Sequence, residues 1–127
     1  MILATHAIAG AALAATMSDQ PVLSFTAGFI SHFLLDAIPH WDYKLRSKQE
    51  DGSNPLNNDI AIGRDFWFDL IKISGDALLG LALSWLFFHS FFSGHGSLGL
   101  LTFTAGATGS LLPDALQFAY FKLRSPW

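Results

Sequence analysis

The chain has 127 residues, enough for one domain, and 51% of them are hydrophobic while only 13% are charged. Soluble domains carry about 25% charged residues, so this composition favours a protein embedded in a lipid bilayer. The net charge of −3, without a basic patch interleaved with aromatic residues, excludes nucleic acid as a partner, and the lack of cysteine excludes disulfides and thiolate metal sites.

Apolar stretches of near-membrane-spanning length dominate the chain. A transmembrane helix needs about 17–25 predominantly apolar residues, and four stretches approach that length: 2–17, 21–39, 77–93 and 97–121. We therefore predict an all-α integral membrane four-helix bundle in a single domain, 1–127. The predicted membrane helices cover about 2–16, 22–38, 73–92 and 97–121. Because two stretches are short, a soluble four-helix protein with unusually buried helices stays open as the alternative.

The middle of the chain is polar and then amphipathic. A linker from Lys44 to Asp59 has its clearest loop signal at residues 51–55. Residues 60–72 mix apolar and charged side chains around Trp67, which predicts an amphipathic helix lying in the membrane interface. Asp65 and Asp69 fit the wet face of that helix.

An internal repeat organises the two halves. Phe25 to Gly28 recurs as Phe103 to Gly106, and Lys44 to Ser47 recurs as Lys122 to Ser125, each 78 residues later. The same offset matches Asp36 with Asp114, and His6 aligns with Asp76 at an offset of 70. We predict two parallel helix-hairpin repeats. They cover about 2–47 and 73–125, with the linker and interfacial helix at about 48–72 between them.

Basic residues predict the orientation. All seven Lys and Arg side chains fall between residues 44 and 72 or at 122 and 124, and the two short turns have none. Under the positive-inside rule, the linker and both termini face the cytoplasm. The predicted location is the cell inner membrane, crossed by several passes.

Five ionisable residues share one predicted depth near the cytoplasmic face: His6, His32, Asp36, Asp76 and Asp114. Ionisable groups inside a membrane are costly and are normally paired or bound to an ion. Their alternative roles are interhelical hydrogen bonding and helix capping, but we interpret them as metal ligands. A His/carboxylate set without sulfur suits Zn, with Mn, Fe, Ni or Co as alternatives, and one or two ions.

Further histidines lie outside this set. His40 and Asp42 follow the second helix and can hold or shuttle a proton as catalytic residues, or simply cap the helix end. His89 and His95 lie towards the other membrane face and are interpreted as non-catalytic.

The segment from His32 to Asp42, together with His6 and Leu111 to Asp114, resembles a bacterial family of membrane-bound metal-dependent hydrolases, which includes the YdjM-like inner-membrane proteins. The first copy has Leu34-Leu35-Asp36 where the family has a Leu-Pro-Asp type motif. The resemblance implies metal ligation by His6, Asp36 and Asp114, extended to His32 and Asp76, and hydrolysis as the reaction class.

We expect a hydrolase that uses a metal-activated water on an ester or phosphoester of a lipid or membrane-associated substrate. A metal-ion or proton transporter using the same His/Asp cluster is the second hypothesis. A non-catalytic membrane assembly module is the third. Four short helices shield the polar cluster poorly, which favours a homodimer.

Overall fold

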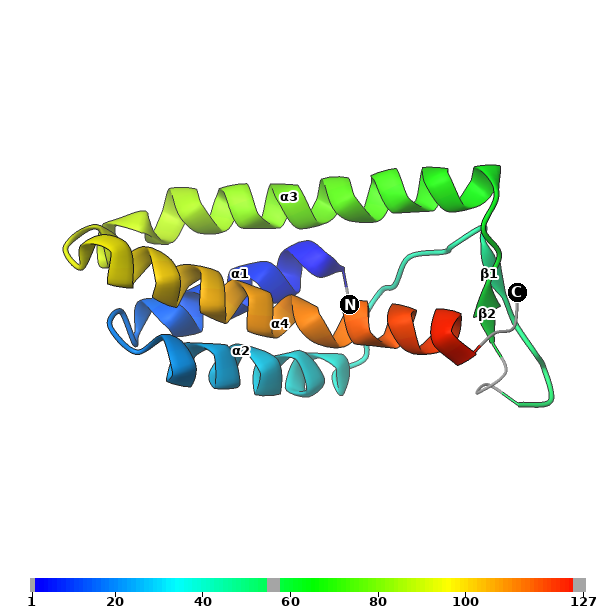
Figure 1. Ribbon diagram of the computed structural model, residues 1–127, viewed down its shortest axis with the longest axis horizontal. Helices are drawn as coiled ribbons and strands as arrows, with labels where there is room; N and C mark the ends of the chain where they lie inside the picture. Colours follow the sequence, from blue (N-terminus) through cyan, green and yellow to red (C-terminus); the bar gives the residue numbers. More distant parts are fainter. Residues whose placement is uncertain (1, 55–57, 125–127) are drawn as a thin grey trace.

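The computed structural model describes residues 2–54 and 58–124. The predicted loop end at Pro55 and the end of the second repeat at Ser125 lie outside these residues. Four helices and one small hairpin make up the described part, so the all-α prediction is confirmed (Figure 1). The elements are α1 (Leu3–Ala15), α2 (Pro21–Asp36), β1 (Lys48–Gln49), β2 (Asp59–Ile60), α3 (Arg64–Ser93) and α4 (Gly96–Arg124).

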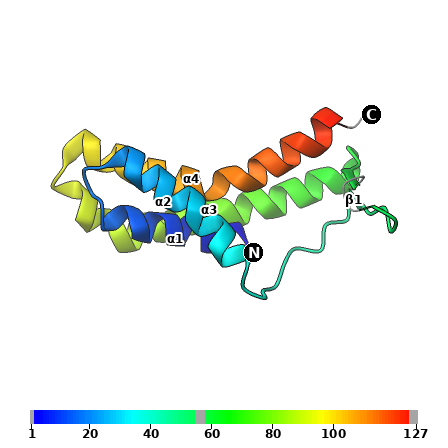
Figure 2. The same ribbon diagram turned by 90° about the horizontal axis from the view of Figure 1, so that it is seen from below.

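The helices form one short pair and one long pair. α1 and α2 contain 13 and 16 residues, and α3 and α4 contain 30 and 29. At about 1.5 Å per residue, α1 is about 20 Å long and α3 about 45 Å. The turns of both pairs lie at one end of the molecule, and α3 and α4 continue past the short pair towards the hairpin (Figures 1 and 2).

The predicted boundary between an interfacial helix and a third membrane helix is wrong. α3 runs without interruption from Arg64 through residues 72 and 73 to Ser93. No proline interrupts this segment, and Gly75 lowers helix propensity by only about 1 kcal/mol, which the neighbouring residues offset. The hairpin was also not predicted, since each of its strands has two residues, paired Lys48 with Ile60 and Gln49 with Asp59.

Small residues allow α1, α2 and α4 to pack closely. A Cβ atom built on Gly28 would lie 2.3 Å from the carbonyl oxygen of Gly106, and one on Gly10 would lie 2.4 Å from the same atom. Ser24 Oγ donates a hydrogen bond to the carbonyl oxygen of Thr102 at 3.0 Å. The helices therefore approach closely at these glycines, and Gly80 makes a similar contact with Ala4 of α1.

Large apolar side chains lie mainly on the surface of the molecule. Among the described residues, the buried apolar set contains five alanines and only two large side chains, Phe92 and Phe103. Ile71, Leu86 and Phe87 of α3 are 63–70% exposed. α3 is long and apolar enough to cross a membrane by length and composition, whereas α1 and α2 are shorter apolar helices.

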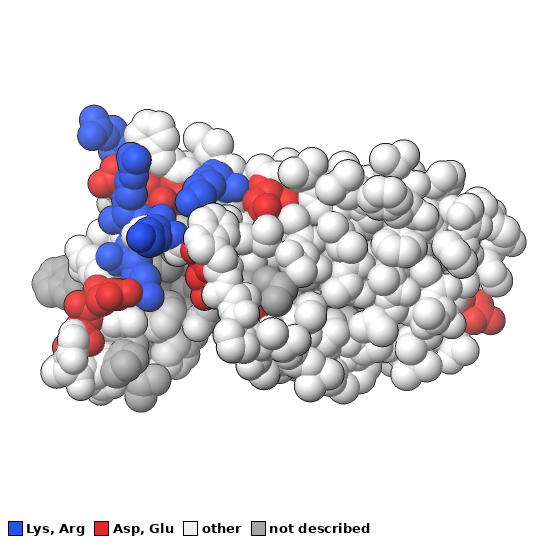
Figure 3. Space-filling view, turned by 180° about the vertical axis from the view of Figure 1, so that it is seen from behind, with Lys and Arg blue, Asp and Glu red and all other residues white. Residues whose placement is uncertain are grey.

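Charged side chains gather around the hairpin end (Figure 3). Asp69 of α3 is 5% exposed there and accepts hydrogen bonds from Ser47 N at 2.8 Å and Ser47 Oγ at 2.7 Å. The prediction that Asp69 lies on a wet face is therefore wrong, because the polypeptide preceding β1 covers this carboxylate. Asp65 is exposed, as predicted.

Candidate metal centre

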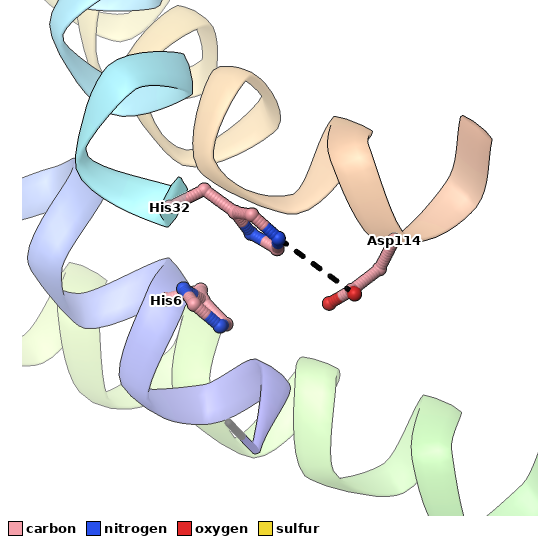
Figure 4. Close-up of side chains that lie close together, drawn as sticks. All are labelled: His6, His32 and Asp114. Atoms are coloured by element: carbon pink, nitrogen blue, oxygen red, sulfur yellow. Dashed lines mark ion pairs between the residues drawn. The ribbon is translucent and has the colours of Figure 1, made fainter. Parts of the chain in front are cut away.

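Two imidazole rings meet where the short helix pair ends. His6 is the fourth residue of α1 and is fully buried, while His32 lies one turn before the end of α2 and is 4% exposed. The rings stack with centroids 4.2 Å apart and an interplanar angle of 25°. Asp114 of α4, directly after Pro113, extends towards them (Figure 4). Three helices thus contribute one side chain each to a single point.

The hydrogen bonding of His32 orients its ring. Its Nδ1 atom lies 2.9 Å from the carbonyl oxygen of Ser110. A carbonyl only accepts hydrogen bonds, so Nδ1 carries the hydrogen and Nε2 points away from α4's backbone. Nε2 lies 3.2 Å from Asp36 Oδ2 and 3.8 Å from Asp114 Oδ1. The lone pair of His32 Nε2 and the two carboxylates repel one another. A cation between them, either a proton or a metal ion, removes this repulsion.

His6 has no hydrogen bond to satisfy its ring. Neither Nδ1 nor Nε2 has a hydrogen-bond partner among the described residues, although both atoms are buried. Nε2 contacts Asp36 Oδ1 at 3.2 Å, without the alignment of a hydrogen bond. A buried, unpartnered ring nitrogen is destabilising unless something else binds it, and a metal ion is one such ligand.

His6, His32 and Asp114, which we call the inner group, have the spacing of a metal site. Each offers one ligand atom, and these atoms all lie within 4.8 Å of one another. Two imidazoles and a carboxylate form a donor set used by divalent zinc and by other transition metals. The residues present therefore fit a divalent cation.

The remaining predicted residues of the first repeat lie beside the inner group. Asp36 contacts His6 and His32, and its Oδ1 also lies 3.7 Å from His40 Nε2. His40 Nε2 lies in turn 3.1 Å from Asp42 Oδ1. The structure thus brings six predicted residues together: His6, His32, Asp36, His40, Asp42 and Asp114.

Asp76 is the predicted ligand that lies elsewhere. Its Oδ2 accepts a hydrogen bond from Ala4 N at 2.8 Å and another from the hydroxyl of Tyr43. Asp76 therefore anchors the first turn of α1, whose free N–H groups attract an acceptor. This role matches the capping alternative considered for the sequence.

Tyr43 was missed by the sequence analysis. Its hydroxyl also accepts a hydrogen bond from Leu3 N at 3.2 Å, and Lys72 Nζ lies 5.2 Å from its ring centroid. Burial raises the pKa of Tyr43, and the hydrogen bond to Asp76 raises it further, so the phenol stays a donor. The sequence indicates this role only through the position of Tyr43 directly after Asp42, a predicted site residue.

The other two histidines lie outside the centre, as predicted. His89 and His95 are both exposed and sit at the end of the molecule where α3 turns into α4. His89 Nδ1 lies 3.3 Å from the carbonyl oxygen of Leu86 in its own helix.

No known protein family, curated protein or solved structure matches this chain. The resemblance to membrane-bound metal-dependent hydrolases therefore stays a prediction.

Proposed function

We propose that this protein is a membrane-embedded metal-dependent hydrolase acting on an ester or phosphoester of a lipid or membrane-associated substrate. The observation that carries the proposal is the inner group, in which two buried imidazoles and Asp114 place their ligand atoms within 4.8 Å of one another. Both ring nitrogens of His6 are buried without a hydrogen bond, a feature that structural packing alone does not explain.

The donor set supports hydrolytic chemistry. A divalent cation such as zinc, when bound, acidifies a water molecule and polarises an ester or phosphoryl oxygen. His6, His32 and Asp114 would hold that cation, with Mn, Fe, Ni or Co as alternatives to Zn. Ser110 fixes the tautomer of His32 through its carbonyl oxygen, an orienting contact typical of ligand histidines. His40 Nε2 contacts both Asp36 and Asp42, and Asp42 is 66% exposed, so a proton leaving the site would pass along these residues to solvent.

Several features support a location in the bilayer. Only 11% of the most apolar 18-residue window of α3 is buried, so this helix is not a core helix of the described fold. Most buried positions in the described part hold Ala, Gly, Ser or Thr, with Phe92 and Phe103 as large apolar exceptions, while many Leu, Ile, Phe and Trp side chains are exposed. Membrane helices pack through small residues because lipid is as apolar as leucine.

The ends of the molecule differ in charge. The hairpin end gathers the basic side chains (Figure 3), whereas the turn between α1 and α2 holds only Asp19 and the turn between α3 and α4 holds no charged residue. We infer that the hairpin end faces the cytoplasm of a bacterial inner membrane.

The position of the inner group favours a lipid-derived substrate. α1 is about 20 Å long, so with its turn at one boundary of the roughly 30 Å hydrocarbon layer, its start lies about 10 Å from the other boundary. Ester and phosphate groups of lipids lie at that boundary. A substrate held there reaches the metal centre without leaving the membrane.

Transport is the weaker alternative. Residues 77–113 contain no Asp, Glu, Lys or Arg. The buried hydroxyls of Ser84, Thr102 and Ser110 donate hydrogen bonds to carbonyls of their own helices. A transit route needs polar groups that face a path through the bundle, and these hydroxyls are already engaged.

The test measures metal content and activity together. The purified protein in detergent should contain at least one equivalent of divalent metal by elemental analysis, and Asp114→Asn should lose it. Asp65→Asn removes an exposed carboxylate elsewhere and should keep the metal. Phosphodiester and carboxylester lipid analogues should be hydrolysed by the parent and by Asp65→Asn, and not by Asp114→Asn. A metal-free parent would contradict both the hydrolase and the transport hypotheses, whereas ion flux in liposomes without hydrolysis would favour transport.

A further inference from the structure

α4 has a proline in its interior, Pro113, directly before Asp114 of the inner group. Proline has no backbone N–H, and its ring clashes with the carbonyl group four residues earlier, so an internal proline bends a helix. α4 bends along its length (Figure 2). Pro113 is also buried, so it lies within the packing of the helices. The residue that bends α4 therefore adjoins a residue of the inner group.

α4 packs differently before and after Pro113. Before it, a Cβ atom built on Gly109 would lie 2.3 Å from the carbonyl oxygen of Phe25 in α2. After it, residues 115–118 are all exposed. The part of α4 that precedes the proline is thus fixed against the backbone of α2. A change of helix direction at Pro113 consequently moves the part that follows, including Asp114.

His32 contacts α4 through both of its ring nitrogens. Nδ1 lies 2.9 Å from the carbonyl oxygen of Ser110, before the proline, and Nε2 lies 3.8 Å from Asp114 Oδ1, after it (Figure 4). In a regular helix, the carbonyl group of residue 110 points along the axis towards the N–H of residue 114. A bend tilts such a carbonyl group outwards. One bend in this turn therefore presents both contacts to the same imidazole ring.

We propose that Pro113 is a positioning residue for the metal centre, because the bend in α4 aims the Ser110 carbonyl and the Asp114 carboxylate at His32. The inference rests on the proposed function. Pro113 has no ligand atom in its side chain and acts through these two groups. An alanine at this position would restore the hydrogen bond to the carbonyl of Gly109 and straighten α4. Helix stability and metal affinity should therefore change in opposite directions.

The experiment compares the parent with Pro113→Ala in detergent. Calorimetric titration with Zn²⁺ should show an affinity at least about tenfold lower in Pro113→Ala, the loss expected when a group that orients a ligand is removed. Metal-free Pro113→Ala should unfold at a denaturant concentration equal to or above that of the metal-free parent. The matched control is Pro21→Ala, since Pro21 lies in the first turn of α2, where proline removes no hydrogen bond within the helix. Pro21→Ala should bind Zn²⁺ like the parent.

Two further measurements separate positioning from a general change of packing. In the zinc-bound parent, NMR should show the Nδ1 hydrogen of His32 protected from exchange, and Pro113→Ala should lose this protection because the Ser110 carbonyl turns away. Spin labels on Leu34→Cys and Leu123→Cys, exposed positions in a chain without cysteine, report the bend in metal-free protein. Straightening by about 20° over the roughly 15 Å from residue 113 to residue 123 moves the end of α4 by about 5 Å, which should change the distance between the labels.

Three results would overturn the positioning role while leaving the proposed function intact. The first is an unchanged Zn²⁺ affinity in Pro113→Ala, and the second is an unchanged distance between the spin labels. The third is a lower affinity together with lower stability of the metal-free variant, because damaged packing gives that combination. A parent that binds no zinc overturns the proposed function and this inference with it.

Discussion

The first helix pair, α1 and α2, has helices of 13 and 16 residues and supplies both imidazoles of the inner group, whereas α3 and α4, with 30 and 29 residues, supply one carboxylate. The long pair instead carries the hairpin and anchors the start of α1 through Asp76. Under the proposed function the difference separates two tasks: the short pair provides two of the three metal-binding side chains, and the long pair provides the frame that holds them in place.

The two pairs still meet at matching positions. Hydrogen bonds join Ser24 to Thr102 and His32 to Ser110, and each pair of residues is 78 apart, the offset of the predicted repeats. Gly28 and Gly106, at the same offset, lie in contact between them. α2 and α4 therefore lie in register, and the change from His32 to Ser110 at matching positions is what makes the chemistry unequal.

The largest effect is expected when His32 of the first helix pair is replaced by serine, the residue at the matching position of the second pair. His32→Ser should lower the affinity for Zn²⁺ more than about 100-fold. Removing a ligand costs more affinity than removing a residue that only forms a hydrogen bond to a ligand. Ser110→Ala keeps the backbone carbonyl that orients His32 and should bind Zn²⁺ normally. Calorimetric titration measures both. Equal affinity in His32→Ser and the parent would remove His32 from the metal centre.

The contact between the two pairs can be broken at a glycine. In Gly28→Leu the new side chain starts 2.3 Å from the carbonyl oxygen of Gly106, so we expect a destabilisation of about 3 kcal/mol, at the upper end for overpacked sites. Gly75→Ala meets no atom within 4 Å and should stabilise α3 by about 0.5–1 kcal/mol. Unfolding in detergent followed by circular dichroism compares the two variants, and equal stabilities would refute the close packing of α2 on α4.

The frame can be weakened away from the metal. Asp69→Ala removes an acceptor that receives two hydrogen bonds from Ser47, and we expect a loss of about 2 kcal/mol. Metal content should not change, because Asp69 lies outside the inner group. Asp65→Ala, at an exposed position in the first turn of α3, should lose less than about 1 kcal/mol. The same unfolding assay, with elemental analysis, tests this separation; loss of metal in Asp69→Ala would show that frame and chemistry are coupled.

The smallest expected effect is at Tyr43. Tyr43→Phe removes the hydroxyl that donates to Asp76 and should cost about 1 kcal/mol at neutral pH. Because burial raises the pKa of Tyr43 in the folded protein, its contribution is complete below the unfolded value of about 10 and decreases as the pH rises above it. The parent should therefore lose stability faster than Tyr43→Phe in that range. Parallel stability curves from pH 8 to 11 would contradict this role.

Much of the fold follows from local sequence patterns. Hydrophobic length and turn residues predicted α1, α2 and α4 to within three residues and the end of α3, but not its start. The repeat placed His6, His32, Asp36 and Asp114 at one depth, where the structure has them together. Helical spacing explains this success, because residues i and i+4 such as His32 and Asp36 share one face.

The misses depend on contacts between distant segments. Asp76 occupies the depth predicted from the repeat, but the register of α3 against α1 brings it to the backbone of Ala4 instead of the rings. The sequence pattern predicted Asp69 on an exposed face, but Ser47 covers its carboxylate in the structure. Neither contact leaves a local signal, since the partners are 72 and 22 residues apart.

The most direct measurement of the central claim is X-ray absorption at the zinc edge of the protein loaded with one equivalent of Zn²⁺. The account predicts the scattering of two imidazole ligands at about 2.0–2.1 Å together with oxygen ligands. That pattern matches His6, His32 and Asp114. A zinc ion coordinated by oxygen alone, without imidazole scattering, would contradict it.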